Sequence, residues 1–273
     1  CPPYAPGGAE YSMLSLAGEL TRQGISVGLV TPCYGRPPEV PSEVELIQLV
    51  SPFDLEPSQS PGVDHWIKSR WFVDSMAVAI RRAWRPRTIV HLHGSAVIPA
   101  GSAAMAQGCG PVVLTVRDTA TVCPHGWCMI TDDRQPVRCC SGLVEQIACA
   151  WGYSGAGGAR GGTLRRLLRQ PRLWRRWLNA VRLRQVARSF DRIVVVSDGF
   201  KKILDANGIY AADRLCSVPN VPPAWDMPDC GVVDEWRRRL ELPVGARIVL
   251  AVGKRSVGKG TPWLLEAMAA VHR

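Results

Sequence analysis

The chain has 273 residues, of which 47% are hydrophobic and 21% are charged, and its formal net charge is +10. This composition suits one large or two ordinary α/β domains and excludes a disordered or fibrous chain. The longest uncharged stretch, Gly94 to Val116, is interrupted by Pro99 and Gln107, so it does not predict a transmembrane helix. The charge excess is local, because ten arginines and no acid lie between Glu145 and Asp191.

The start of the chain and its cysteines indicate the compartment. The first residue is Cys1, and no basic segment followed by an apolar one succeeds it, so we interpret the sequence as a fragment without a leader. Several of the ten cysteines, among them Cys33, Cys109 and Cys216, lie in or beside apolar runs, where a reduced thiol packs as a small hydrophobe. We therefore expect a cytoplasmic protein.

The first element is a loop rich in proline and glycine, Cys1 to Gly8, that leads into a helix ending at Gly24. Met13, Leu14, Ala17 and Leu20 fall on one face of this helix. In nucleotide-binding α/β domains such a turn follows the first strand. No strand precedes it here, so we predict that the first strand is missing.

Short apolar runs then alternate with helical patterns, which predicts a Rossmann-like parallel sheet. Polar residues end several of the runs, and the carboxyl ends of parallel strands are where ligands bind. We expect strands at Ile25–Thr31, Val44–Val50, Thr88–His93, Pro111–Val116, Arg192–Ser197 and Leu215–Asn220, and helices at Asp64–Trp84, Ala96–Gln107, Gly199–Ala206 and Val232–Leu242.

Five cysteines lie between Cys123 and Cys149. The side chains of Cys123, Cys128, Cys139 and Cys140, with His125 as a further ligand, offer a tetrahedral zinc site. Adjacent cysteines diverge, however, and the spacing is poor for a metal. We favour packed thiols and expect no metal, with zinc as the alternative.

A basic amphipathic helix is predicted after Pro171. One reading places its tryptophans in a membrane interface and its arginines on anionic head groups, and the other packs its apolar side on the sheet. Nucleic acid is the weakest partner, because no aromatic platform or reading motif accompanies the arginines. The residues expected at an anionic membrane are Arg172, Trp174, Arg175, Arg176 and Trp177.

Near the end of the chain, Ile248 to Val252 predicts a buried strand, and Thr261 followed by Pro262 predicts a helix start. The loop between them carries Lys254, Arg255 and Lys259, a strong positive field for a diphosphate. A solvated surface loop is the plain alternative. The spacing also approaches that of a nucleotide-triphosphate P-loop, but Gly260 stands where Ser or Thr would hold magnesium.

Six segments in this order resemble the motifs of family-4 glycosyltransferases, which have the GT-B fold. They are PPYAPGGAE, the VHLH strand end, TVRD, VVVS, VPN and GKRSVGKG. Three positions depart from the family pattern: Arg117 replaces a histidine, Val221 a glycine and Lys254 an arginine. Arg117 implies either an unusual sugar or an acidic group on it.

The resemblance implies the N-terminal Rossmann-like domain of a GT-B enzyme over residues 1–222, a linker and helix at 223–246, and a truncated second Rossmann-like domain at 247–273. It also implies a retaining, metal-independent transfer from a nucleotide-diphosphate sugar to a lipid-linked or polysaccharide acceptor at the inner face of the membrane. The family's carboxylate motif is absent, so we expect no activity from these residues alone. The alternatives are a P-loop NTPase and a noncatalytic membrane-surface protein.

The resemblance also assigns roles to individual residues. It places the catalytic groups at His93 and Asp118, the donor-diphosphate contacts at Gly7, Gly8, Lys254 and Lys259, and the sugar or acceptor pocket at Glu10, Arg117, Ser197 and Asn220.

Overall fold

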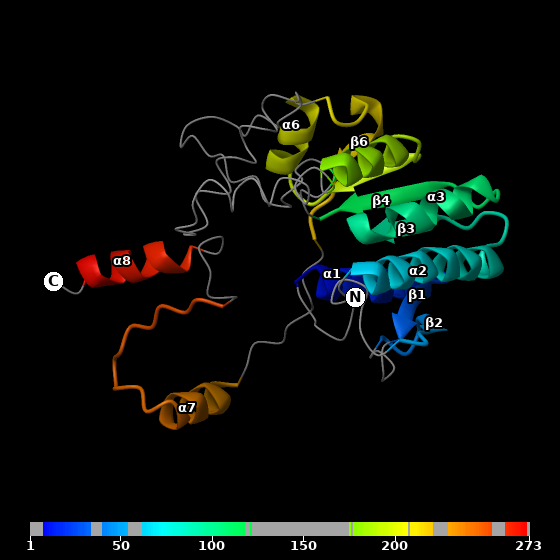
Figure 1. Ribbon diagram of the computed structural model, residues 1–273. Coiled ribbons are helices and arrows are strands. Elements are labelled where there is room, and N and C mark those ends of the chain that lie inside the picture. The colour runs from blue at the N-terminus through cyan, green and yellow to red at the C-terminus, as the bar shows by residue number, and fades with distance from the viewer. Residues whose placement is uncertain are drawn as a thin grey trace. The chain divides into compact units, whose positions relative to one another are not determined.

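The computed structural model describes residues 8–33, 40–53, 62–117, 121, 175, 177–206, 208–220, 229–252 and 260–271. The chain forms two compact units, Cys1–Pro223 and Ala224–Arg273. The first unit holds every strand in the described part of the chain (Figure 1).

The centre of the first unit is a parallel sheet with the strand order β3-β4-β5-β6. Its strands are β3 (Val90–His93), β4 (Val112–Val116), β5 (Arg192–Val195) and β6 (Leu215–Ser217). Each lies within a predicted strand and is shorter than the prediction by one to three residues at one end. The predicted Rossmann-like parallel α/β architecture is therefore confirmed.

One row of apolar side chains crosses this sheet. Leu92 pairs with Leu114, Leu114 with Ile193, and Ile193 with Leu215. All four are at most 4% exposed. Because side chains alternate between faces along a strand, this row fixes one face of the sheet to the core and leaves His91 and His93 on the other face.

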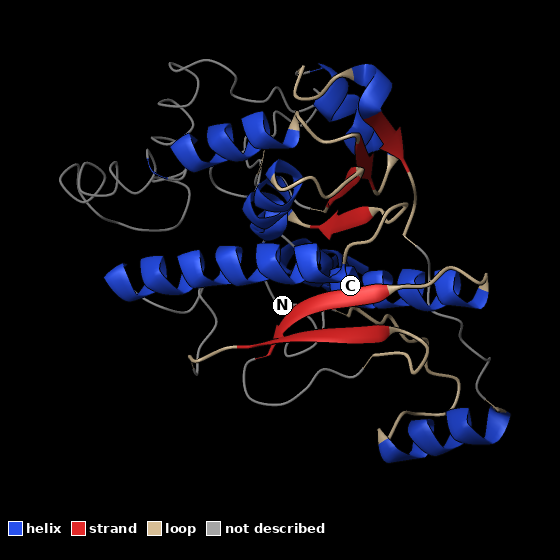
Figure 2. Ribbon diagram, turned by 90° about the vertical axis from the view of Figure 1, so that its right-hand side faces the viewer, coloured by secondary structure: helices blue, strands red, loops and turns tan. Residues whose placement is uncertain are grey.

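A second parallel pair lies apart from this sheet (Figure 2). It consists of β1 (Gly28–Cys33) and β2 (Glu45–Val50), and α2 (Gly62–Ala83) packs on both strands as well as on α3 (Ile98–Ala106). That the first strand is missing from this sequence stays a prediction, because residues 1–7 lie outside the described residues.

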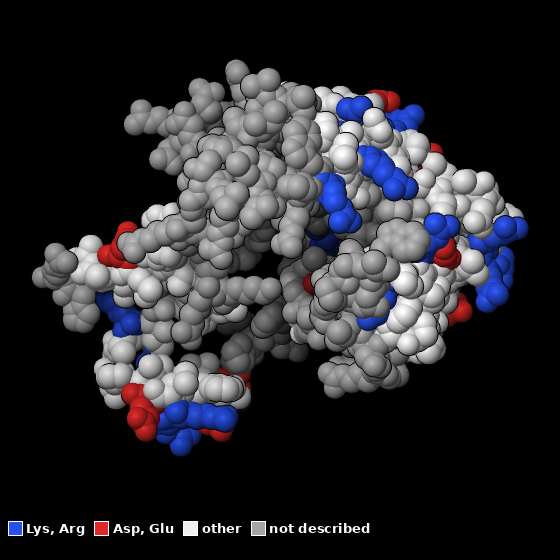
Figure 3. Space-filling model, viewed as in Figure 1, with Lys and Arg blue, Asp and Glu red and all other residues white. Residues whose placement is uncertain are grey.

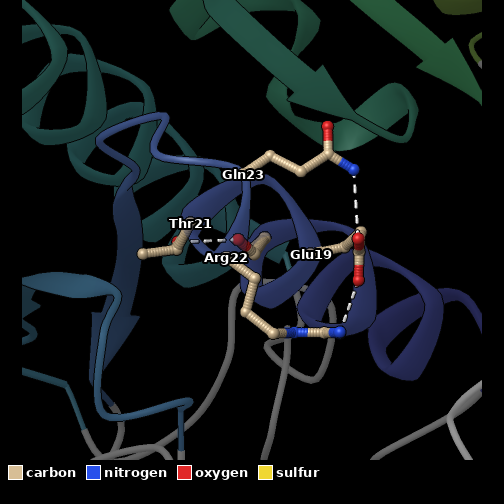
Figure 4. A network of polar contacts seen from close by, with 5 residues as sticks. Glu19, Thr21, Arg22 and Gln23 are labelled. Atoms are coloured by element: carbon tan, nitrogen blue, oxygen red, sulfur yellow. Dashed lines mark hydrogen bonds and ion pairs between the residues drawn. The ribbon is translucent and has the colours of Figure 1, made fainter.

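Helix α1 (Gly8–Arg22) buries Ser12, Met13 and Ala17. It ends in a Schellman motif, in which Ile25 N–H donates to Leu20 O at 3.0 Å and Gly24, at φ 82°, adopts the left-handed conformation that favours glycine. Side chains close the last turn around Glu19, which accepts from Gln23 at 3.0 Å and pairs with Arg22 at 2.6 Å (Figure 4). The helix therefore ends where the sequence predicts.

Glycine is required in α3, where the helix approaches β3 closely. A Cβ on Gly101 would overlap Leu92, lying 3.0 Å from Cδ2 and 3.1 Å from Cγ. We expect Gly101→Ala to lower the free energy of unfolding by about 1–3 kcal/mol through overpacking. The control is Gly18→Ala in the middle of α1, where the Cβ would meet Pro41 at an ordinary 3.5 Å and the change should stabilise the chain by roughly 0.5–1 kcal/mol. Equal effects in urea unfolding would contradict this close packing.

The basic stretch continues into a helix over residues 177–187 that buries Ala180, Leu183 and Ala187. Two arginines of this stretch bond backbone carbonyls: Arg184 Nε in the helix donates to Thr121 O at 3.1 Å, and Arg188 Nε just after the helix donates to Ile209 O at 2.9 Å. Part of this charge therefore stabilises the fold.

Three further helical segments lie in the described part of the first unit. They are η2 (Ser95–Val97), which precedes α3, α6 (Asp198–Ala206), which packs on β5 and β6, and η3 (Ala212–Arg214), which leads into β6.

The second unit contains α7 (Cys230–Arg239) and α8 (Thr261–Val271), and none of its described residues is buried. Arginines of the last turn of α7 form a strip beside acidic side chains (Figure 3). The predicted buried strand at Ile248–Val252 is wrong: these residues are irregular, with Leu250 80% and Val252 90% exposed. A strand needs a partner strand, and the described residues of this unit supply none.

Candidate functional site

Four polar residues from distant parts of the sequence meet at the carboxyl edge of the four-stranded sheet. His93 ends β3, Arg117 follows β4, Asn220 follows β6, and Ser12 comes from α1. After His93 the chain turns at Gly94, which has φ 88° and donates its N–H to Thr115 O at 3.0 Å. We call His93, Arg117, Asn220 and Ser12 the edge cluster.

Arg117 is the centre of the edge cluster. Its Nη1 donates to Asn220 Oδ1 at 2.9 Å, and its Nη2 lies 3.2 Å from His93 Nδ1. Asn220 Oδ1 also accepts a hydrogen bond from Ser12 Oγ at 3.0 Å. One guanidinium and one amide oxygen thus connect α1 with the ends of three segments, which fixes the geometry of the edge.

Two histidine rings lie close together beside Arg117, tilted by 36° to each other. The ring centroids of His91 and His93 are 4.2 Å apart, and His91 Nε2 lies 2.7 Å from Thr115 Oγ1. Burial, then His91, then Arg117 lower the pKa of His93 from 6.5 to about 3. Burial and Arg117 lower the pKa of His91 to about 4, but His91 keeps more exposed surface, so the stronger effect belongs to His93. Both rings are neutral near pH 7.

Arg117 also bears the cost of burial. Burial lowers the pKa of the guanidinium below its ordinary value, and the carboxylate of Glu10 opposes that shift. Its Nε is buried and has no hydrogen-bond partner among the described residues. The edge therefore holds a positive charge next to two neutral imidazoles, an arrangement that can bind hydroxyl and anionic oxygens.

We expect acid to destabilise the first unit through His93. Its pKa is about 3 when folded and about 6.5 when unfolded, so the unfolded state binds more protons between these values. The stabilisation from a neutral His93 is complete above about pH 6.5 and falls by up to about 1.4 kcal/mol per pH unit below it. The free energy of unfolding, measured in urea at several pH values, should change less with pH for His93→Gln than for the wild type. An equal pH dependence in the two proteins would contradict the burial of a neutral ring.

The other predicted site residues divide into two groups. Glu10 lies in the first turn of α1 and Gly8 begins that helix, while the Ser197 hydroxyl accepts from Phe200 N–H at 3.2 Å and caps α6. The residues Gly7, Asp118, Arg172, Trp174, Arg176, Lys254 and Lys259, and the cysteines 123, 128, 139 and 140, lie outside the described residues. The described ranges contain no group of three His, Cys, Asp or Glu side chains that could hold a metal ion.

Sequence reasoning missed two contributors to this edge. Ser12 lies on the inner face of α1, and its partner Asn220 is 208 residues away. Thr115 is 4% exposed within β4 and looks like an ordinary strand residue. The only available signal was a serine among the apolar residues of the helix face.

The family model for glycosyltransferase family 4 matches residues 6–221, most of the chain and the whole edge cluster. The chain belongs to glycosyltransferase family 4. The match ends before residues 253–259, so the glycosyltransferase assignment rests on the first unit.

This family-4 chain is also similar to a solved structure, the apo form of UGT2 from Phytolacca americana. The two share 13% identity with a TM-score of 0.47, over 86% of this chain and 53% of that one. The family-4 chain thus spans about half the length of that protein. No curated protein matches the sequence.

Proposed function

We propose that this family-4 chain belongs to a retaining glycosyltransferase that moves a sugar from a nucleotide-diphosphate sugar to a lipid-linked or glycan acceptor without a metal ion. The observation that carries the proposal is the edge cluster. It lies within the residues matched by the family and at the sheet edge where α/β domains bind ligands. The predicted roles of His93 and Asp118 as catalytic groups belong to this proposal.

The proposal gives different binding roles to different residues. The first unit would bind the transferred sugar and the acceptor through Glu10, Arg117, Ser197 and Asn220. The resemblance to family-4 enzymes assigns contacts with the donor diphosphate to Gly7, Gly8, Lys254 and Lys259. Cations there would offset the charge that develops as the diphosphate leaves, the main electrostatic demand of the reaction. The GT-B arrangement of two Rossmann-like domains is part of the same proposal.

Arg117 narrows the choice of substrate. Its guanidinium is a cation with directional donors, which suits a carboxylate or phosphate better than a neutral hydroxyl. We therefore propose an acidic group on the sugar or on the acceptor at this position. A panel that includes uronic-acid and neutral nucleotide sugars tests this choice directly.

The experiment is a transfer assay on the full polypeptide that contains these residues. We expect release of nucleoside diphosphate in the presence of EDTA, and no turnover by residues 1–273 alone, because the family's carboxylate motif is absent from them. Magnesium-dependent ATP hydrolysis that is lost in Lys259→Ala, with no transfer from any nucleotide sugar, would favour a P-loop NTPase instead.

We also propose that the protein works at the cytoplasmic face of an anionic membrane. In the helix over residues 177–187, Leu178 is 57% exposed and Arg182 is exposed, and Arg175 just ahead of it is exposed too. None of the helices in the described ranges is both long and apolar enough to cross a bilayer. Contact would therefore occur at the surface.

We expect binding to phosphatidylglycerol vesicles to weaken as salt is raised, because the attraction is screened. Arg175→Gln should reduce affinity about fivefold, the effect of losing about 1 kcal/mol per basic residue at the surface. The matched control is Arg192→Gln at the start of β5, which removes an exposed arginine outside the proposed contact. Equal losses in both variants, or binding that is insensitive to salt, would contradict membrane contact through this helix.

A further inference from the structure

We propose that Arg117 is a positioning residue that holds the His93 ring with its proton on Nε2. His93 then serves as a hydrogen-bond donor to a substrate oxygen and not as a general base. The assignment of the ring proton stands on the structure alone. Only its use toward a sugar oxygen rests on the proposed function.

The first step is the identity of the donor. A guanidinium has five N–H donors and no acceptor, so the nitrogen that it contacts must supply a lone pair. Arg117 Nη2 lies 3.2 Å from His93 Nδ1. Nδ1 is therefore the unprotonated nitrogen, and a neutral imidazole in this position carries its proton on Nε2.

The second step is that Arg117 cannot easily turn away. Its Nη1 donates to Asn220 Oδ1 at 2.9 Å, and the same oxygen accepts from Ser12 Oγ at 3.0 Å. Two donors on one oxygen also fix the orientation of the amide. The planar fork of arginine spans Asn220 and His93 at once, a geometry that the single ammonium of lysine does not reproduce.

The third step concerns the charges that face His93 from the elements around it. The tilted ring of His91 lies beside it on β3, Arg117 approaches from the residue after β4, and the Glu10 carboxylate of α1 acts on Arg117. A proton added to His93 would place a cation beside the guanidinium in a largely buried position. The ring therefore stays neutral, in agreement with the lowered pKa of His93.

These contacts and charges limit the roles that His93 can have in catalysis. A general base needs a free lone pair, but Nδ1 is occupied by Arg117 and Nε2 already carries the proton. Among the described residues none bonds His93 Nε2, so its N–H is available to a ligand. A fixed neutral donor suits a sugar hydroxyl or an oxygen that gains negative charge during transfer.

Nitrogen NMR of ¹⁵N-histidine-labelled protein measures which ring nitrogen of His93 carries the proton. The His93 signals are assigned from their loss in His93→Gln. Between about pH 8 and about pH 5, we expect Nδ1 to show the ¹⁵N chemical shift of an unprotonated nitrogen and Nε2 that of a protonated one. In Arg117→Met the two tautomers should mix, and the ring should titrate nearer its ordinary value. Arg192→Met removes an arginine at the opposite edge of the sheet and should leave the spectrum unchanged.

Arg117→Lys provides a second variant that keeps the charge, in case Arg117→Met fails to fold. It should lose the single tautomer in part, because the ammonium lacks the rigid planar fork that aims one donor at each partner. A protonated Nδ1 in the wild type, or an unchanged tautomer in both Arg117 variants, would overturn the proposal.

Kinetics separate this proposal from the proposed function. In the transfer assay, Arg117→Lys should lower kcat about tenfold or more, with a smaller change in KM, if His93 is used in the transition state. NMR could show the expected tautomer while no nucleotide sugar supports transfer. That result would overturn the proposed function and the substrate role of His93. The positioning role of Arg117 would stand.

Discussion

Replacing Phe190 with alanine is expected to lower the free energy of unfolding by about 3–5 kcal/mol. Phe190 is fully buried in the core just before β5, and its carbonyl accepts a hydrogen bond from Arg214 Nη1 at 3.2 Å. Removal of the ring deletes its buried apolar surface and leaves a cavity that a close-packed core fills only in part. Since small domains are stable by roughly 5–15 kcal/mol, the variant should be close to unfolding at body temperature.

Urea unfolding followed by circular dichroism measures this loss. The matched control is Tyr11→Ala in α1, another aromatic truncation, because Tyr11 is 55% exposed and should cost no more than about 1 kcal/mol. A loss at Phe190 as small as that at Tyr11 would mean that Phe190 does not fill a close-packed core.

In the transfer assay, His93→Ala is expected to lower kcat about 10²–10³-fold, the usual effect of removing one donor aimed at developing negative charge. The ring of His93 is at the carboxyl edge, is neutral, and is held by Arg117 at 3.2 Å. Its loss therefore removes a pre-positioned donor without removing a charge.

His93→Gln distinguishes a donor from a base. A glutamine amide can donate a hydrogen bond but cannot accept a proton at neutral pH, so it should recover part of the activity lost in alanine. Equal losses in the glutamine and alanine variants would show that His93 transfers protons. Circular dichroism of both variants should match the wild type, so that the comparison reports chemistry and not folding.

The strands of the four-stranded sheet could be predicted because each is a short apolar run that ends at a polar residue or a turn. A short apolar run of this kind is typical of a strand buried in a sheet, and Leu92 of β3 pairs with Leu114 of β4 in the buried row. The same reasoning failed at Ile248–Val252. An apolar run shows that a segment needs to be covered, but it does not show that a partner strand is present to pair with it.

The edge cluster was predictable only in part. His93, Arg117 and Asn220 each end or follow an apolar run, so the parallel topology places them at one edge. The hydrogen bonds among these side chains, and the one from Ser12, depend on where side chains far apart in the sequence point. The strand pattern does not give those directions. The pKa of His93 likewise depends on burial and on Arg117, neither of which can be read from the strand pattern.

The most direct test of the account is a crystal structure of the polypeptide that contains these residues, bound to the nucleotide sugar it uses. The account predicts the sugar at the carboxyl edge of β3 and β4, with an oxygen about 2.6–3.2 Å from His93 Nε2 and an acidic group near Arg117. A sugar bound away from His93, Arg117 and Asn220 would contradict it.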